Sequence, residues 1–166
     1  MQYDNSQVRR QDRLLAEARA REILEHGEYG FLALGDTTGG YGIPVNYVYR
    51  EGVCYFHCAP EGEKLRRLER NPQVTFCVVG RTAPCPERFT TEYESILLSG
   101  HLERVTDDEE RMHALSLIIG KYAPQFQETG MKYAQGSFHR TAILRLTVER
   151  WSGKCKYLPG SPMATK

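Results

Sequence analysis

Apolar and polar residues alternate along much of the middle of the chain, which is the pattern of strands buried on one face. The clearest alternation runs through residues 41–49 and places five apolar side chains on one face: Tyr41, Ile43, Val45, Tyr47 and Tyr49. Short runs rich in β-branched and aromatic residues predict five further strands: 29–34, 53–58, 74–79, 91–105 and 141–148. Turn residues join the first strands, so the pattern predicts an antiparallel meander.

Three segments have the composition and the boundaries of helices. Residues 9–26 are rich in Leu, Ala, Glu and Arg, and a glycine follows them, as at many helix ends. Residues 60–71 predict a shorter helix with a proline in its first turn. Thr106 and Glu109 form a capping box that begins the third helix, and Pro124 ends it.

The remaining segments lack a clear period. Residues 81–89 carry two prolines and predict a loop, residues 125–138 are polar and predict irregular structure, and residues 159–166 predict a disordered tail. Gly100 is a candidate bulge within its long strand. Residues 1–158 contain no repeat or linker and therefore predict one domain. Six strands and three helices in this order predict an α+β fold, an antiparallel β-barrel with helices at its ends.

Composition narrows the classes of protein. The chain has 166 residues, of which 40% are hydrophobic and 26% charged, as in ordinary globular domains. Its 22 basic and 21 acidic residues leave a net charge of +1, so it lacks the field that attracts nucleic acid or an anionic membrane. No apolar run approaches the ~20 residues of a spanning helix, and the first residues lack the apolar core of a signal peptide. We therefore expect a cytoplasmic protein.

The cysteines give little evidence for a metal or a disulfide framework. Their number is odd and their spacing shows no pairs, which fits a reducing compartment. Cys54, His57 and Cys58 lie close in sequence, but on a strand His57 points away from the two cysteines. A single tetrahedral ion could not use all three without a bulge, so we expect no metal site.

Three motifs occur in a specific order along the chain. They are Pro-x-Asn-Tyr at 44–47, Tyr-Phe-His at 55–57 and Glu-Gly-x-Lys-x-x-x-Leu at 61–68. Together with the segment 89–95, they resemble the FMN-binding split-barrel proteins related to pyridoxamine 5′-phosphate oxidase, and within these the nitroimidazole-reductase-like branch. The resemblance extends over about 22–123 and implies a six-stranded split barrel of the FMN-binding type. It also implies a homodimer with FMN in grooves between the subunits.

The resemblance assigns the cofactor phosphate to Lys64, which the pattern places at the start of a short helix, where free N–H groups also attract anions. It places Val45, Asn46 and Tyr47 along the flavin ring. Asn46 also stands out because asparagine is unfavourable within an apolar strand.

The other expected site residues follow from the same resemblance. Phe56 and His57 would lie over the ribityl chain and ring, and His57 is a candidate proton donor, although a purely positioning role remains open. Tyr93 and Ser95 would approach the cofactor from the long central strand. Trp151, at the end of the last predicted strand, would close the groove from the other subunit.

The leading hypothesis is an FMN-dependent reductase of nitro-aromatic or similar small acceptors. No glycine-rich dinucleotide motif is present, so NAD(P)H could only visit the same groove. The strand at 43–48 has no Lys or Arg, in contrast to pyridoxamine phosphate oxidases, so oxidation of that substrate is not expected. Two alternatives stay open: a non-catalytic flavin- or heme-binding protein of the same fold, and a structural dimer with an empty groove.

Overall fold

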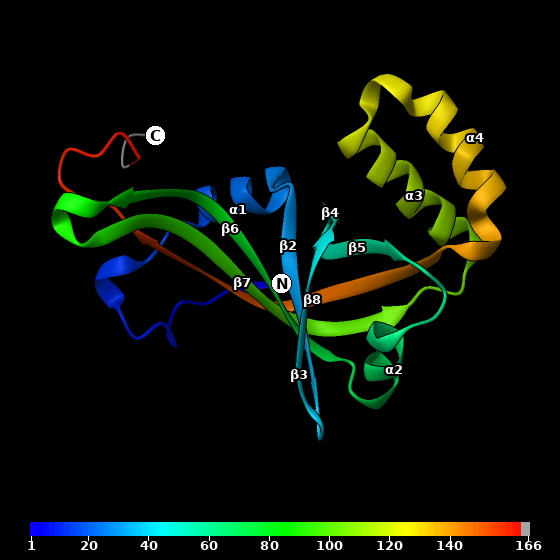
Figure 1. The fold of residues 1–166 in the computed structure, drawn as a ribbon, viewed down its shortest axis with the longest axis horizontal. Helices are drawn as coiled ribbons and strands as arrows, with labels where there is room; N and C mark the ends of the chain where they lie inside the picture. Colours follow the sequence, from blue (N-terminus) through cyan, green and yellow to red (C-terminus); the bar gives the residue numbers. More distant parts are fainter. Residues whose placement is uncertain (164–166) are drawn as a thin grey trace.

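The computed structural model describes residues 1–163 and contains one large sheet with helices at two places on it (Figure 1). The strands are β1 (Gln2–Tyr3), β2 (Tyr29–Asp36), β3 (Gly39–Asn46), β4 (Val48–Arg50), β5 (Val53–Cys58), β6 (Gln73–Cys85), β7 (Thr90–Arg104) and β8 (Ala142–Lys156). The helices are α1 (Glu17–His26), α2 (Glu63–Arg70), α3 (Asp108–Tyr122) and α4 (Gln127–Ser137). None of these helices is both long and apolar enough to cross a membrane.

The sheet curls into a barrel that its hydrogen bonds do not close. The strand order is β3-β2-β6-β7-β8-β5-β4, with antiparallel neighbours throughout, and β1 adds to β8 in parallel. The first and last strands of this order, β3 and β4, are consecutive in the chain and only Tyr47 separates them. The chain therefore has the split-barrel architecture expected from its sequence. The single strand predicted at 41–49 is broken at this residue.

The interior of the barrel is a continuous apolar core. Phe76 of β6 lies at its centre, with ring centroids 4.9 Å from Tyr47 and 5.1 Å from Phe56. The inward faces of the strands pack against α1 and α2 through leucines and isoleucines, including Ile23, Leu24, Leu65, Leu68, Leu98 and Leu146. The alternation read from the sequence at 41–49 is confirmed, because all five apolar residues of that stretch belong to this core or pack against it.

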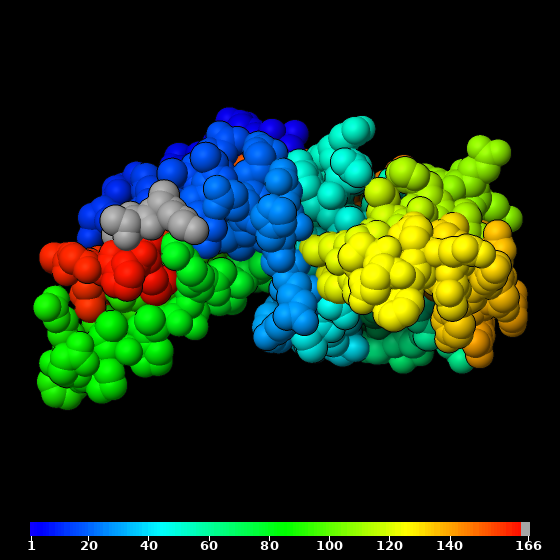
Figure 2. Space-filling model, turned by 90° about the horizontal axis from the view of Figure 1, so that it is seen from above, coloured from blue at the N-terminus to red at the C-terminus, as the bar shows by residue number. Residues whose placement is uncertain are grey.

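Helices α3 and α4 cover the outer face of the sheet at one end only. They pack over β4, β5 and β8 through a second apolar cluster that includes Ile143, Leu115 and Ile118. The cap of α3 is Asp107, one residue after the predicted Thr106, and its carboxylate accepts the Glu110 N–H at 2.7 Å. Figure 2 shows these helices, in yellow-green to orange, at one end of the molecule.

The outer face of the sheet at the opposite end lacks such a cover. Tyr29, Phe31, Val79 and Leu97 of β2, β6 and β7 are 46–52% exposed there. Phe31 lies opposite Cys77, which in turn lies opposite Leu97, so the apolar residues are contiguous across three strands. We call this surface, formed by Tyr29, Phe31, Val79 and Leu97, the bare face.

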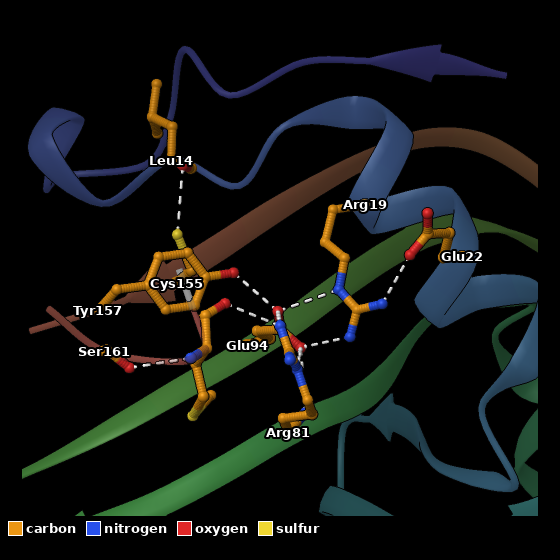
Figure 3. A network of polar contacts seen from close by, with 9 residues as sticks. Leu14, Arg19, Glu22, Arg81, Glu94, Cys155, Tyr157 and Ser161 are labelled. Atoms are coloured by element: carbon orange, nitrogen blue, oxygen red, sulfur yellow. Dashed lines mark hydrogen bonds and ion pairs between the residues drawn. The ribbon is translucent and has the colours of Figure 1, made fainter. Parts of the chain in front are cut away.

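A buried carboxylate organises the inner side of this same end (Figure 3). The Glu94 side chain is fully buried, and it accepts hydrogen bonds from Arg19 of α1 (2.8 and 3.0 Å), from Arg81 of β6 (3.0 Å) and from the Tyr157 hydroxyl (2.7 Å). Burial alone would raise the pKa of Glu94, but these donors outweigh it and hold the pKa well below its usual range. Arg81 also donates to the Met163 carbonyl at 2.8 Å, which fastens the last described residues.

Two segments differ from the predictions in secondary structure. Residues 125–138, expected to be irregular, contain α4, which packs against α3. Gly130 explains both the weak helix signal and the packing, because a Cβ there would lie 2.7 Å from Ile119 Cγ2. Residues 9–16, expected to be helical, instead run beside β8, where the Leu15 N–H donates to the Gly153 carbonyl at 3.1 Å.

Two further segments are more ordered than the sequence indicates. Strand β6 extends to Cys85 and uses part of the predicted loop at 81–89. Of the tail at 159–166, Ser161 and Met163 are buried, in contrast to the expected disorder, and residues 164–166 lie outside the described chain. The bulge predicted at Gly100 is confirmed, because the register of β7 with β8 shifts there.

Candidate functional site

The barrel is open between strands β3 and β5, which are not hydrogen-bonded to each other. Strand β4 pairs with β5 in a regular register, which, if it continued, would place Asn46 opposite His57 and Val45 opposite Cys58. Strand β3 pairs with β2 only, so its other edge has no strand partner. Backbone N–H and C=O groups along these two edges are therefore available to a ligand.

A clamp fixes the chain at the point where the split begins. The Tyr47 N–H donates to the Tyr122 hydroxyl at 2.9 Å, and the Tyr47 carbonyl accepts from Tyr122 (2.7 Å) and from Lys121 Nζ (3.0 Å). Lys121 Nζ also donates to the Gly27 carbonyl at 2.7 Å. Burial lowers the pKa of Lys121 to about 8. The clamp joins the end of α3 to the α1–β2 corner and to the residue between β3 and β4.

Lys64 lies in the first turn of α2, beyond the end of β5. Glu63, the only carboxylate in that turn, pairs with Arg66 at 3.0 Å and with Arg67 at 2.6 Å. Within the described chain, Lys64 forms no ion pair, and no side chain caps this helix. Gly62, at the cap, has φ of +125° and no atom within 4 Å of an added Cβ, so the approach to the helix N–H groups is open. These features fit a bound anion.

His57 and Cys58 lie between the barrel split and Lys64. The imidazole is exposed, while the thiol is half-buried. The protein atoms around the ring and the Lys64 ammonium lower the pKa of His57, so the ring is neutral at pH 7. Burial raises the pKa of Cys58, and Lys64 acts in the opposite direction. This part of the site therefore offers a neutral imidazole beside a fixed positive charge.

Three expected site residues lie far from this group. Ser95 pairs with Lys154 of β8, whereas His57 pairs with Ile143 of the same strand. These two positions of β8 are eleven residues apart, which corresponds to roughly 36 Å of strand at ~3.3 Å per residue. Tyr93 and Trp151 lie on the Ser95 side of β7 and β8. One chain does not bring the expected residues together.

A groove of about 400 Å³ lies on the outer face at the Ser95 end. Its floor is formed by β6, β7 and β8 and its wall by residues of the N-terminal segment, including Asp4, Val8 and Arg9. At the other expected position, Val45 and Asn46 border a shallow hollow with Tyr29 and Phe31 of the bare face. Both hollows therefore adjoin the bare face.

Three of the expected aromatic side chains are buried within the chain. Trp151 lies within β8 rather than at its end, and its indole packs beside Tyr3 and Arg21 under the groove at the Ser95 end. The Phe56 ring is buried in the core, so only the backbone of Phe56 faces the edge of β5. Tyr47 is fully buried, and its hydroxyl donates to the Leu24 carbonyl at 2.7 Å.

The remaining expected residues keep access to a ligand. Val45 is half-buried on an edge strand, Asn46 is exposed, and its amide nitrogen donates to the Glu28 carbonyl at 3.0 Å. One N–H of the Asn46 amide is thus already engaged in a hydrogen bond within the chain. Among residues 1–163, no group of three or more His, Cys, Asp or Glu side chains is arranged to hold a metal ion.

Sequence reasoning missed the residues that support the site. Glu94 could have been found, because Glu92 and Glu94 occupy the inward positions of a strand that continues inward with Ile96. Lys121 and Tyr122 gave no such signal, since their role depends on the broken strand at Tyr47. The basic residues that line the groove, Arg9, Arg150 and Lys154, come from segments far apart in sequence, so their proximity could not be predicted.

An open barrel with two unpaired strand edges is the architecture of the split-barrel class of proteins. A sequence model of pyridoxamine 5′-phosphate oxidase matches residues 16–155, and the chain belongs to this family. No curated protein matches the chain in sequence.

Solved structures show the same fold. A candidate 5-nitroimidazole antibiotic resistance protein from Bacteroides thetaiotaomicron is 24% identical, with 86% of each chain covered and a TM-score of 0.71. A FAD-binding protein from Mesorhizobium loti is 21% identical over 87% of this chain and 98% of its own, with a TM-score of 0.63. A flavocytochrome from Azotobacter vinelandii is 16% identical over 93% and 75%, with a TM-score of 0.74.

Proposed function

We propose that this protein is an FMN-dependent oxidoreductase that acts as a homodimer and reduces nitro-aromatic or similar small acceptors. Membership of the pyridoxamine 5′-phosphate oxidase family supports the flavin. The similarity in fold to a candidate 5-nitroimidazole resistance protein supports the class of acceptor. Strand β3 has no Lys or Arg, which argues against a phosphorylated pyridoxamine substrate.

The main support for the proposal is that the expected site residues form two groups, which lie far apart along strand β8. Val45, His57 and Lys64 lie near the barrel split, whereas Tyr93 and Ser95 lie near the opposite end of β8. A cofactor that touches both groups needs two copies of the chain. The bare face supports this arrangement, because a contiguous exposed apolar surface is typical of a subunit interface.

The residues at the split fit FMN rather than an uncharged flavin. Lys64 and the open first turn of α2 would hold the phosphate, since both attract anions and no carboxylate of the described chain pairs with Lys64. The free edge of β3 at Val45 would bind the polar edge of the ring. When bound, FMN supplies the capacity to accept and transfer electrons.

His57 would act on the acceptor through its exposed neutral imidazole. A neutral ring carries one N–H, so it can donate a hydrogen bond to a nitro oxygen and hold it beside the cofactor. The surrounding protein atoms, and to a lesser extent the positive charge of Lys64, lower the pKa of His57, which favours this donor role over an imidazolium. The apolar core around Phe56 excludes water from the inner face of strand β5.

Lys64→Ala tests the cofactor assignment, with Arg66→Ala as the matched control. Loss of one charge-assisted hydrogen bond should weaken FMN binding by about 1.5–3 kcal/mol, whereas riboflavin, which lacks the phosphate, should bind both proteins alike. Arg66 pairs with Glu63, so its replacement should leave FMN affinity unchanged. Fluorescence titration measures both ligands. Equal FMN affinity of the Lys64→Ala variant and the unaltered chain would contradict the assignment of the FMN phosphate to Lys64.

A non-catalytic heme- or flavin-binding role is the second candidate, and the exposed imidazole of His57, which could bind a heme iron, favours it. An absorption spectrum of the purified protein separates the two. Flavin bands support the oxidoreductase, whereas a Soret band that is lost in His57→Phe supports the heme-binding role.

A further inference from the structure

A cleft that the proposed flavin site does not use lies beside β4, the last strand of the sheet order. Its volume is about 710 Å³, within the usual range of small-molecule pockets, roughly 300–1,000 Å³. Residues of α1, β4 and α3 line it, and Figure 1 shows β4 between these two helices. The lining residues include none of the expected cofactor residues and none of the bare face. The cleft is therefore separate from both.

Strand β4 presents one free pair of backbone groups to this cleft. The two-residue turn after Arg50 makes Arg50 and Val53 a hydrogen-bonded pair, so Tyr49 directs its N–H and C=O away from β5. Tyr47 points to the same side, but side chains of α3 already occupy both of its backbone groups. Neither backbone group of Tyr49 has a partner among residues 1–163. The free edge is thus one residue long, between the clamp and the turn.

Charged side chains of both signs line the cleft in equal number once internal pairing is considered. Arg21 lines it but pairs with Glu17 at 2.9 Å. The other four charged residues form no ion pair within the described chain, and they are two cations and two carboxylates: Arg50, Lys121, Glu25 and Glu51. This balance favours a ligand without net charge over a phosphate or another anion.

The charges also have an order along the strand edge. Lys121 Nζ donates to the Tyr47 carbonyl at 3.0 Å, so it lies at the end nearer the Tyr49 N–H. An ammonium has three N–H groups, and Lys121 uses two of them, on Tyr47 and Gly27, which leaves one for a ligand. Glu51 belongs to the turn that follows β4, at the end nearer the Tyr49 carbonyl. A cation therefore lies at the donor end of the free pair and a carboxylate at the acceptor end.

We propose that this cleft binds a free α-amino acid with an apolar side chain. The carboxylate would accept the Tyr49 N–H and the ammonium would donate to the Tyr49 carbonyl, as one residue of an antiparallel strand does. Lys121 would lie beside the carboxylate and Glu51 beside the ammonium, as charge-assisted partners. The side chain would contact Val48 and Leu117, which also line the cleft. An extended peptide is less suited, because the clamp and the turn limit the free edge to one residue.

Calorimetric titration of the full chain with L-leucine, with and without added FMN, tests this proposal. We expect L-leucine to bind at least about tenfold more tightly than isocaproate, which lacks the ammonium, and isoamylamine, which lacks the carboxylate. Glu51→Gln should weaken L-leucine binding by about tenfold. Glu87→Gln is the matched control and should leave the affinity unchanged, since Glu87 is an exposed carboxylate between two strands with no ion pair in the described chain.

Amide NMR spectra of the same mixtures report directly on the strand edge. L-leucine should slow the hydrogen exchange of the Tyr49 amide, which has no partner in the free chain, and leave that of Val48, which pairs with β5, unchanged.

Four results would overturn the proposal. They are no binding of L-leucine at millimolar concentration, unchanged affinity in Glu51→Gln, unchanged exchange of the Tyr49 amide at saturation, or equal affinity for N-acetyl-L-leucine amide, which would indicate a peptide as the occupant. The flavin absorbance of the same samples reports on the proposed function separately. L-leucine binding by a protein that retains no flavin would support the assignment of the cleft and contradict the oxidoreductase.

Discussion

The two ends of the sheet are stabilised by different means. At the α3–α4 end, apolar side chains such as Ile143 and Ile118 cover the outer face. At the other end the outer face is bare, and a buried ionic network around Glu94 holds α1, β6, β7 and the C-terminal residues together from the inner side. The first end is complete within one chain, whereas the second exposes an apolar surface on its outer side.

This difference supports the proposal that the second end forms the subunit interface. Helices that pack on a sheet face remove it from any other use, as α3 and α4 do over β5. The opposite end has no helix on its outer face, so this face would remain free for the proposed partner, and the Glu94 network stabilises this end from the inner side. The expected site residues Tyr93 and Ser95 lie on that end, which agrees with a site completed by a second copy.

Removal of the buried charge should have the largest effect. Glu94→Gln leaves Arg19 and Arg81 without their shared carboxylate and should lower the free energy of unfolding by about 3–5 kcal/mol. Urea denaturation at pH 7 measures this change. Lys132→Gln, which removes a pair with the exposed Glu128, is the control and should cost less than ~1 kcal/mol.

The same network sets a pH dependence. Because the pKa of Glu94 is lower in the folded chain than its ordinary value of 4.5, its stabilisation is present above that pH and is lost as the pH falls below it. The unaltered protein should therefore lose stability below about pH 4.5 more steeply than Glu94→Gln. Parallel curves for both proteins would show that another carboxylate controls acid unfolding.

Matched substitutions on the two outer faces should separate folding from association. Ile143→Ala, on the covered face, creates a cavity and should cost about 2–5 kcal/mol at every protein concentration. Val79→Glu, on the bare face, should leave the monomer folded and remove the increase of Tm with protein concentration that a dimer shows. Thermal scans over a hundredfold range of concentration measure both. A concentration-dependent Tm in Val79→Glu would exclude the bare face as the interface.

The sequence predicts local features well where the cause is local. The bulge at Gly100 was predictable because a glycine within a strand often marks a bulge or a close approach of two backbones. The structure shows such an approach, since a Cβ at Gly100 would lie 2.0 Å from the Thr147 carbonyl oxygen. The start of α3 was readable to within one residue from its capping motif. Helix α4 was not, because its glycines lower helix propensity and only contact with Ile119 explains Gly130.

The candidate site was predicted in part. The motif correctly placed Lys64 in the first turn of a helix and His57 on the strand before it. The complete burial of the Tyr47, Phe56 and Trp151 side chains was not predictable, because an alternating pattern does not show which face of a strand points into the core of a curled sheet. Nor could the motifs reveal that the expected residues form two groups, since this follows from the length of β8.

Restoration of a site in mixed dimers tests the central claim most directly. Lys64→Ala and Ser95→Trp should each bind FMN poorly as homodimers, because every site in each contains one altered residue. Refolding an equal mixture should restore FMN binding in hybrid dimers, in which one of the two sites receives both unaltered residues. Tight binding at about one quarter of all sites, measured by flavin titration, is the result predicted. No tight binding in the mixture would show that the two groups of residues do not share a cofactor across two chains.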